Sequence, residues 1–339
     1  MKKLNIKIYW MIMFIFFAVI SNGYAEQVPH IFTPNSHAKS YQVNENFQYL
    51  LDRIEDRRQT TVDCGTSGNG SGINDAINQR YNVIYIKGIC KENIILDSWH
   101  TGMSKIALIG AHGDSKTDEI VDNSSKDSPV IQIHNMDAVY VANMSIYGGW
   151  SGINSYNTDL ETYDLQIRNY SNDGINFNNG YFYTSKLTTQ GESNSNVGLN
   201  INNASLNMHE LNISGSNKGI NINFSKGFLN DVTIQGNTES ESGIDINNST
   251  LDMNDLYVND NSQDGIRIHG SKGKIRNSEI NNNIHQGIGI YDGSYFEIIS
   301  ANISGSRIGM SVIDGSFVEL HESINLTNDN LHSGYEWCP

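Results

Sequence analysis

The sequence predicts an all-β solenoid of short parallel strands, wound in coils of about 22 residues, with a helical cap at its N-terminal end. Three observations predict this fold. A Gly-aliphatic-x-apolar unit returns every 21 to 24 residues, pairs of alternating apolar residues follow it, and Asn, Gly, Ser and Asp stand between the pairs. Charged residues make up only 17% of the 339 residues, which is unlike the composition of a helical bundle.

The first 25 residues have the features of a secretory signal peptide. Three lysines precede an apolar run of 12 residues at 9–20, and the small-residue site Gly23-Tyr24-Ala25 follows it. The apolar run is too short to cross a bilayer. We therefore expect cleavage after Ala25, a secreted or periplasmic location, and no membrane insertion of the mature chain.

Residues 26–80 are expected to form an N-terminal cap region with helices and a first strand. Apolar residues recur at helical spacing between Tyr41 and Arg58, and a second short helix is expected at 73–80. Such helices would shield the open strand edges at the end of a solenoid. The solenoid itself is expected at 81–326, and a C-terminal tail or cap at 327–339.

Two of the three cysteines are expected to form a disulfide. Cys64 and Cys90 lie near the start of the mature chain, which is expected to enter an oxidising compartment. A loop of that size would stabilise the fold by roughly 3 kcal/mol. Cys338 is left over, either as a free thiol or as a partner for another chain. No metal site or cofactor is predicted, since Cys and His do not occur at ligand spacing; calcium stays open without a supporting motif.

The repeat unit gives the coils their register. It occurs in eight successive coils, at Gly152-Ile153, Gly174-Ile175, Gly198-Leu199, Gly219-Ile220, Gly243-Ile244, Gly265-Ile266, Gly287-Ile288 and Gly309-Met310. Two further apolar pairs follow within a coil, as in Leu206/Met208 and Leu211/Ile213. Each pair alternates with polar residues, which indicates a short strand with one buried face. Three short strands per coil must pair with their equivalents in the next coil, because each alone buries too little.

The Gly-Ile-x-Ile unit at this spacing resembles the repeat of the pectate-lyase-like superfamily, over about residues 84–326. The segments at 62–65, 82–86 and 106–110 are similar to the opening coils of secreted bacterial members. The resemblance implies a single-stranded right-handed parallel β-helix and a carbohydrate-related function. The paired aspartates of polygalacturonase-type hydrolases, the Asp-Pro-His motif of mannuronan epimerases and the calcium-binding aspartates of pectate lyases are absent from the matching positions.

One candidate site lies where the outward residues of the first strands change from Asn to charged and aromatic types. We expect Asp245, Arg267 and His269 on adjacent coils as candidate catalytic residues, and the side chains of Asn247, Asp264 and Tyr291 as substrate contacts. By resemblance, Arg267 or His269 would abstract a proton from a uronate, with Asp245 positioning it, in β-elimination or epimerisation. The alternative is a solvated Asp/Arg pair beside a surface histidine.

A second candidate site is aromatic. Trp150, Tyr156 and Tyr170 fall within neighbouring coils, and Tyr147 and Tyr170 are expected to stack at one corner. Exposed aromatic rings bind sugars because their faces match the C–H surface of a pyranose. The alternative is that these rings pack at corners and under loops. The Asn residues that dominate the earlier coils are expected to form a side-chain ladder.

The expected partner is a polysaccharide or a cell-surface glycan. The formal net charge of −15 and the lack of a basic stripe disfavour a nucleic-acid partner. Two function classes stay open: a carbohydrate-active enzyme of the lyase, epimerase or hydrolase type, and a noncatalytic surface or matrix adhesin. The oligomeric state is also open.

Overall fold

The computed structural model describes residues 58–339, except 193, 238–240, 322–323, 328–330 and 334–339. The predicted signal peptide, the helix expected at 41–58 except its last residue, and Cys338 lie outside the described residues. The chain divides into units at Met1–Glu55 and Asp56–Pro339, and all described residues belong to the second unit. Within these residues, no helix is long and apolar enough to span a membrane.

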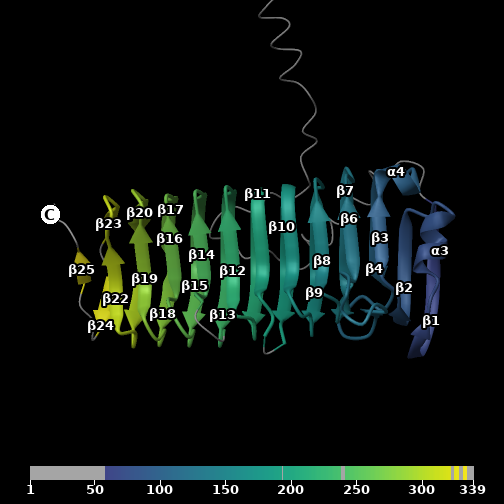
Figure 1. Ribbon diagram of the computed structural model, residues 1–339, viewed down its shortest axis with the longest axis horizontal. Coiled ribbons are helices and arrows are strands. Elements are labelled where there is room, and N and C mark those ends of the chain that lie inside the picture. The colour runs from purple at the N-terminus through teal and green to yellow at the C-terminus, as the bar shows by residue number, and fades with distance from the viewer. Residues whose placement is uncertain (1–57, 193, 238–240, 322–323, 328–330, 334–339) are drawn as a thin grey trace, which may run out of the picture. The chain divides into compact units, whose positions relative to one another are not determined.

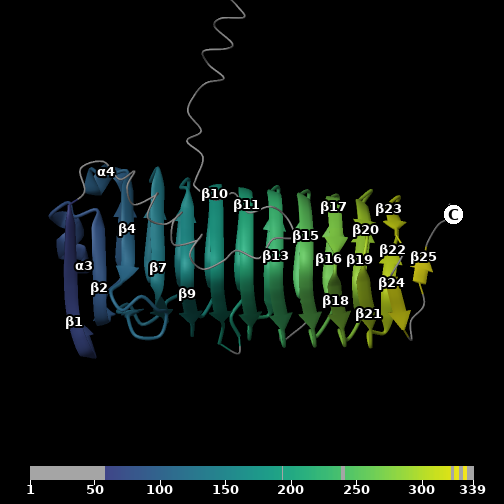
Figure 2. The same cartoon turned by 180° about the vertical axis from the view of Figure 1, so that it is seen from behind.

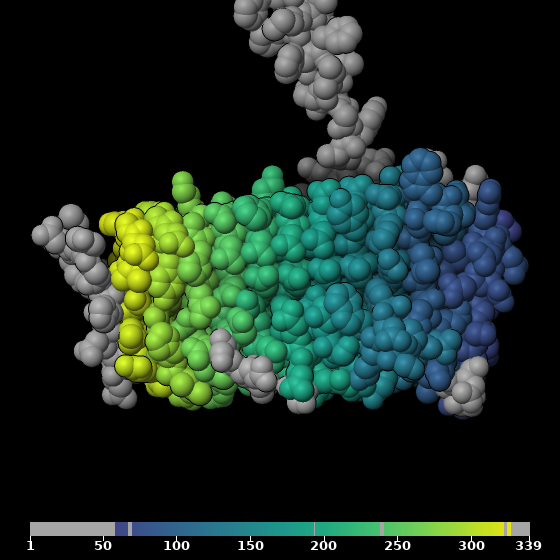
Figure 3. Space-filling model, viewed as in Figure 1, coloured from purple at the N-terminus to yellow at the C-terminus, as the bar shows by residue number. Residues whose placement is uncertain are grey.

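The second unit is a parallel β-helix. Its strands stand side by side in one row from β1 to β25, seen from both sides in Figures 1 and 2. Each strand pairs in parallel with its equivalent in the next coil, and all 25 strands form one continuous sheet. Successive coils occupy successive places along the row, as the colour gradient of Figure 3 shows. The parallel solenoid predicted from the repeat is confirmed, and so is the right-handed β-helix that the resemblance implies.

The first strands of eight coils, from β8 to β22, carry the Gly-aliphatic-x-apolar unit, and the first strands of the coils before and after them lack the glycine. The first strands are β3 (Ile94–Asp97), β6 (Ile131–His134), β8 (Ser151–Tyr156), the start of β10 (Asp173–Gln190), the start of β11 (Val197–Ser214), β12 (Lys218–Asn223), β14 (Ile244–Asn247), β16 (Ile266–His269), β19 (Gln286–Tyr291), β22 (Ile308–Val312) and β25 (Leu331–Ser333). The unit fixes their register, since Ile175 pairs with Leu199, and Ile244 pairs with Ile266.

The second and third strands complete each coil. Several strands run through the corner between the two positions: β2 (Val83–Lys91), β7 (Ala138–Tyr147), β9 (Leu160–Arg168), β13 (Lys226–Gln235) and β15 (Thr250–Asn259), as well as β10 and β11. Strand β1 (Gln59–Gly70) likewise extends from the second to the third position. The separate second strands are β4 (Lys105–Gly110), β17 (Lys272–Arg276), β20 (Tyr295–Ile298) and β23 (Phe317–Leu320). The separate third strands are β5 (Glu119–Val121), β18 (Ser278–Asn281), β21 (Ala301–Ser304) and β24 (Ile324–Thr327).

The core runs through the inside of the coils. The predicted inward pairs Leu206/Met208 and Leu211/Ile213 are buried, as are the aliphatic residues of the first strands. A fully buried Leu, Ile or Met side chain contributes about 1.5–3 kcal/mol relative to an exposed one. Stacked rows of such side chains are therefore the main source of stability, and the outward residues are left available for other roles.

Left-handed backbone conformation turns the chain at the corner after each first strand from β6 to β22. We call the residues at this corner the first corner row: Asn135, Asn157, Asn179, Asn203, Phe224, Asn248, Gly270, Asp292 and Asp314, with φ between 48° and 67°. Asn, Asp and Gly tolerate this conformation best. A serine ladder follows the row, in which Ser249 Oγ accepts from Ser225 N and Ser271 Oγ accepts from Ser249 N, both at 3.0 Å. The ladder holds the corner backbone in place.

A short helix and a disulfide lie in the first two described coils. Helix α3 (Ile73–Asn78) buries Ile73 and Ile77 beside β1 and β2, so a short helix in the predicted segment 73–80 is confirmed. The Glu92 carboxylate accepts from the backbone N–H of Ile73 at 2.8 Å and thereby caps this helix. The predicted Cys64–Cys90 disulfide is present, with a Cα–Cα distance of 5.2 Å. A second short helix, α4 (Ser98–Thr101), follows β3.

Candidate functional site

The outward residues of the first strands form two parallel columns, which we call the first-strand face. One column runs through Ile95, Gln132, Asn154, Asn176, Asn200, Asn221, Asp245, Arg267, Gly289 and Ser311. The other runs through Asp97, His134, Tyr156, Asn178, Asn202, Asn223, Asn247, His269 and Tyr291. The register therefore has the predicted order, and at about 4.8 Å per coil the second column extends for roughly 38 Å.

Asparagine amides bond to one another along this face. Asn176 Nδ2 donates to Asn154 Oδ1 at 3.1 Å, and Asn221 Nδ2 donates to Asn200 Oδ1 at 3.0 Å. In the second column, Asn223 Nδ2 donates to Asn202 Oδ1 at 2.9 Å. The predicted ladder is confirmed. An amide in such a ladder still has a second N–H and a second lone pair, so it can bind a ligand without breaking the ladder.

The residue before each repeat glycine forms a further, largely buried column beside the first-strand face. Its polar members are Ser151, Asp173, Lys218, Ser242, Asp264 and Gln286. The glycine after them is required by close packing, since a Cβ on Gly265 would lie 2.7 Å from Gly287 O. Sequence reasoning identified Asp264 but not the column. The signal was present, because polar residues precede the glycine in most coils.

Asp245 lies on the first-strand face with its carboxylate buried among polar partners. Lys218 Nζ lies 2.5 Å from Oδ2, Arg267 Nε lies 4.0 Å from Oδ1, and Ser242 Oγ donates to Oδ1. Both carboxylate oxygens are thus occupied by neighbours on the protein. Asp245 is placed to hold Lys218 and Arg267 in position.

Arg267 is held as a cation between two carboxylates. Its Nε donates to Asp264 Oδ2 at 2.9 Å. Burial alone would lower the pKa of Arg267, but Asp245 and Asp264 outweigh that effect and raise it. Asp264 also accepts from Gln286 N at 3.1 Å and lies 2.8 Å from His285 Nδ1. Arg267 is therefore suited to donate hydrogen bonds to a ligand, and this environment opposes its expected use as a base.

His269 and Tyr291 form the aromatic part of the cluster. Their rings stack with centroids 4.8 Å apart, and His269 Nδ1 lies 2.7 Å from Asp292 Oδ2. The Tyr291 hydroxyl donates to Gln286 Oε1 at 2.7 Å. Burial raises the pKa of Tyr291, and the negative charge of Asp264 raises it further. A histidine paired with a carboxylate in this way can act as an acid or base through its other nitrogen.

The structure brings all the predicted residues of this first site together. Asn247 pairs with His269, which pairs with Tyr291 in the next coil. Asp264 and Arg267 belong to the same coil as His269. Trp150 and Tyr156 lie apart from this cluster, since Tyr156 precedes His269 by five positions in its column.

The predicted aromatic platform is only partly present. Tyr170 is fully buried, and its hydroxyl lies 2.8 Å from Ser216 Oγ. Burial raises the pKa of Tyr170 to about 12. Tyr147 pairs with Arg168 rather than stacking on Tyr170. The expectation that Tyr170 contacts a ligand at the surface is therefore wrong, because this ring packs inside a corner, whereas Trp150 and Tyr156 are exposed.

A second exposed group lies at the N-terminal end of the first-strand face. Ile95 is 58% exposed, Trp99 on α4 is 86% exposed, and Tyr156 is 55% exposed. Gln132 and His134 stand between Ile95 and Tyr156 in the two columns, with their side-chain nitrogens 3.0 Å apart. Sequence reasoning missed Ile95 and Trp99 because the long segment between β3 and β6 interrupts the 22-residue spacing.

Replacing Asp173 with Asn is expected to stabilise the protein only at neutral and higher pH. Burial raises the pKa of Asp173 to about 6, with hydrogen bonds from Asn200 and Val197 opposing the shift, and Oδ1 has no partner. The folded state therefore prefers the protonated acid. The stability that the protonated Asp173 contributes is fully present below the ordinary pKa of an aspartic acid, and it is lost as the pH rises through about 6.

At about pH 8 the Asp173→Asn variant should gain about 1–3 kcal/mol in free energy of unfolding, and near pH 4 it should match the wild type. Urea denaturation at both pH values measures this. An equal difference at the two pH values would show that burial of the charge is not the cause.

Among the residues that the structure describes, no group of three or more His, Cys, Asp or Glu side chains is arranged to hold a metal ion. In the cluster around Arg267, the carboxylates of Asp245 and Asp264 are instead paired with the cations Lys218 and Arg267, and His269 and His285 lie beside Asp292 and Asp264.

No protein-family model matches this sequence, and no curated protein sequence matches it. Several solved structures are similar to the chain. The periplasmic alginate epimerase AlgG is 13% identical, with a TM-score of 0.48 over 90% of this chain and 97% of that chain. The A-module of the Azotobacter vinelandii mannuronan C-5 epimerase AlgE4 is 12% identical, with a TM-score of 0.48 over 83% and 100%. The catalytic domain of a GH87 α-1,3-glucanase is 12% identical, with a TM-score of 0.34 over 90% and 71%. Likenesses this distant carry no inference about activity or substrate.

Proposed function

We propose that the protein binds an extended polysaccharide along the first-strand face. The observation that carries this proposal is the uninterrupted ladder of asparagine amides in the middle of the face, with exposed aromatic groups at one end and the His269–Tyr291 stack at the other. Amides donate and accept hydrogen bonds, as sugar hydroxyls do. Aromatic rings at the ends supply stacking surfaces for sugar rings.

The charges favour a neutral polymer over a strongly anionic one. Lys218 and Arg267 supply positive charge beside the face, and both are already paired with buried carboxylates. The chain as a whole has a formal net charge of −15. A polyanion would therefore meet overall repulsion, which weakens its association.

Binding can be tested with a neutral β-glucan, a neutral galactomannan and a polyuronate. The double variant Asn200→Ala/Asn221→Ala removes two neighbouring amides from the ladder. At about 0.5–1.5 kcal/mol for each lost hydrogen bond, its affinity should fall roughly tenfold. Asn212→Ala is the matched control, because Asn212 is exposed in the part of β11 that forms the third side of the coil, away from the first-strand face. Isothermal titration calorimetry measures both variants after their melting temperatures have been compared.

The proposal fails if the wild type binds none of the three polymers, or if Asn212→Ala weakens binding as much as the double variant does. A neutral polymer should bind more tightly than the polyuronate, and the reverse order would contradict the charge argument.

A second candidate function is processing of the bound polymer. It is favoured by the His269–Asp292 pair, which stands beside the cationic Arg267 on the same face. His269 would exchange a proton with the sugar through its second nitrogen, while Arg267 would bind an oxygen of the sugar. His269→Gln should then abolish product formation even at polymer concentrations that saturate binding, since loss of the His269 ring also weakens stacking. Release of reducing ends or of unsaturated sugars from the three polymers tests this, and an equal rate in His269→Gln would exclude the role.

A further inference from the structure

Phe224 occupies a corner position that disfavours it. All other members of the first corner row are Asn, Asp or Gly, whereas Phe224 has a bulky side chain at φ 50°. A side chain of this kind is strained in the left-handed conformation. Its ring is also 63% exposed, so burial offers little compensation. Neither local conformation nor packing explains a phenylalanine here.

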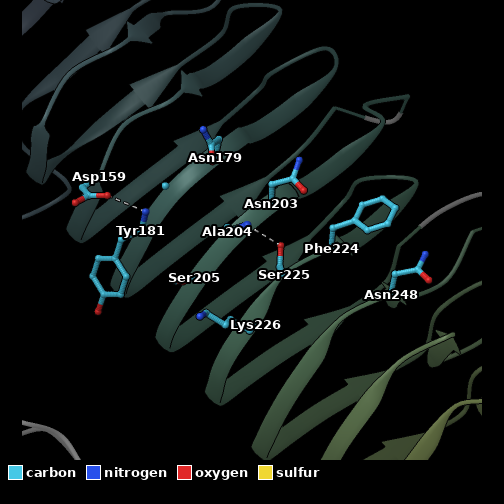
Figure 4. A pocket seen from close by; sticks show the side chains of 11 residues that line it. Asp159, Asn179, Tyr181, Asn203, Ala204, Ser205, Phe224, Ser225, Lys226 and Asn248 are labelled. Atoms are coloured by element: carbon cyan, nitrogen blue, oxygen red, sulfur yellow. Dashed lines mark hydrogen bonds between the residues drawn. The ribbon is translucent and has the colours of Figure 1, made fainter. Parts of the chain in front are cut away.

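The ring stands at the edge of a hollow that lies outside the first-strand face. Asn203 and Asn248 flank Phe224 in the corner row, and Tyr181 and Lys226 line the same hollow, which has a volume of about 580 Å³ (Figure 4). The amides of Asn203 and Asn248 are exposed. An aromatic ring between two exposed amides combines a stacking surface with hydrogen-bonding groups on both sides.

A second hollow of about 420 Å³ continues from the first, since Ser205 and Lys226 line both. Its lining includes Gly227 and Phe228, whose ring is 44% exposed. Gly227 cannot carry a side chain, because a Cβ there would lie 2.1 Å from Leu206 O. The two hollows thus form one open trough with a phenylalanine in each part.

We propose that this trough is a second carbohydrate-binding site, in which Phe224 stacks on a pyranose ring and Asn203, Asn248 and Lys226 bind its hydroxyls. The first hollow is lined mainly by amide, hydroxyl and backbone groups around the Phe224 ring, whereas Leu206 and Phe228 make the second hollow more apolar. That composition suits a sugar, whereas a protein partner would be expected to meet a contiguous apolar core. The serine ladder fixes the backbone beside Phe224, since Ser225 N donates to Ser249 Oγ at 3.0 Å.

The test uses ¹³C-phenylalanine-labelled full-length protein titrated with cellohexaose, mannohexaose and xylohexaose. The Phe224 ring resonance, assigned by its loss in Phe224→Asn, should shift with at least one of these sugars. The Phe317 resonance serves as an internal control, because that exposed ring stacks on Tyr295 at a different place and should not shift. Asn200→Ala/Asn221→Ala should leave the Phe224 shift unchanged, so failure of this site and failure of the first-strand face can be distinguished.

Phe224→Asn should also have a stability effect opposite to that of an ordinary core substitution. Because Asn accepts the left-handed conformation, the melting temperature should rise by about 2–4 °C while sugar binding at the trough is lost. A lower melting temperature would mean that Phe224 has a packing role, and would overturn the proposal. A Phe224 resonance that does not shift with any of the three sugars would also overturn the proposal. So would a resonance that shifts only with protein concentration, because that would indicate that a second copy of the protein occupies the trough.

Discussion

The Arg267→Met variant is expected to lose about 2–4 kcal/mol in free energy of unfolding and to lose activity on any polymer that the His269 cluster processes. Arg267 is the cation between the carboxylates of Asp245 and Asp264, both of which are buried. Removing Arg267 leaves the buried Asp264 carboxylate without its cation, whereas Asp245 keeps its contact with Lys218. Methionine keeps most of the volume, so a lost charge rather than a cavity causes the effect. Urea denaturation followed by circular dichroism measures it.

Two further variants separate charge from structure. Arg307→Met is the matched control, because Arg307 is exposed and should change stability by no more than about 0.5 kcal/mol. Adding Asp264→Asn to Arg267→Met removes the carboxylate that has lost its cation, and it should restore part of the lost stability without restoring activity. If Arg267→Met proves as stable as the wild type, the two carboxylates are neutralised by other groups and the central role of Arg267 is wrong.

The coil register could be predicted because it depends on a simple periodic pattern. An inward aliphatic residue at nearly constant spacing must stack on its equivalent, and this places Asp245 beside Arg267 and His269 beside Tyr291. The outward positions follow directly, since side chains alternate along a strand. The neighbours in the candidate site therefore follow from the fold, even where the sequence says little about their chemistry.

Corner positions could not be predicted in the same way. Tyr170 and Trp150 both lie near corners outside the alternating pattern, yet Tyr170 is buried and Trp150 is exposed. The direction of a side chain there depends on the exact path of the backbone, which composition does not specify. The burial of Asp264 before the repeat glycine is a corner property as well.

Phe224 shows where a corner can be interpreted from the sequence after all. Once the coils are aligned, every member of the first corner row except Phe224 is Asn, Asp or Gly. A phenylalanine in that alignment is a local conflict, and such conflicts in a folded protein are expected at functional positions. The signal was available from the repeat, but it depended on recognising that the row adopts a left-handed conformation.

The Gly273→Asn variant is expected to lose about 3–5 kcal/mol in free energy of unfolding, and it tests the packing between coils directly. A Cβ on Gly273 would lie 1.8 Å from Leu251 O, which belongs to the paired position of the preceding coil. The two strands would have to separate, and hydrogen bonds between the coils would be lost or lengthened.

The matched control for this variant is Gly293→Asn, which introduces the same side chain at a corner instead of in strand β17. Gly293 has φ 68°, which asparagine accepts, and no atom lies within 4 Å of its would-be Cβ. This variant should therefore cost under about 1 kcal/mol. Urea denaturation of both variants gives the comparison. Similar losses at the two positions would mean that the coils can part at Gly273 without penalty, and the close register that aligns the first-strand face and the trough beside Phe224 would then be in doubt.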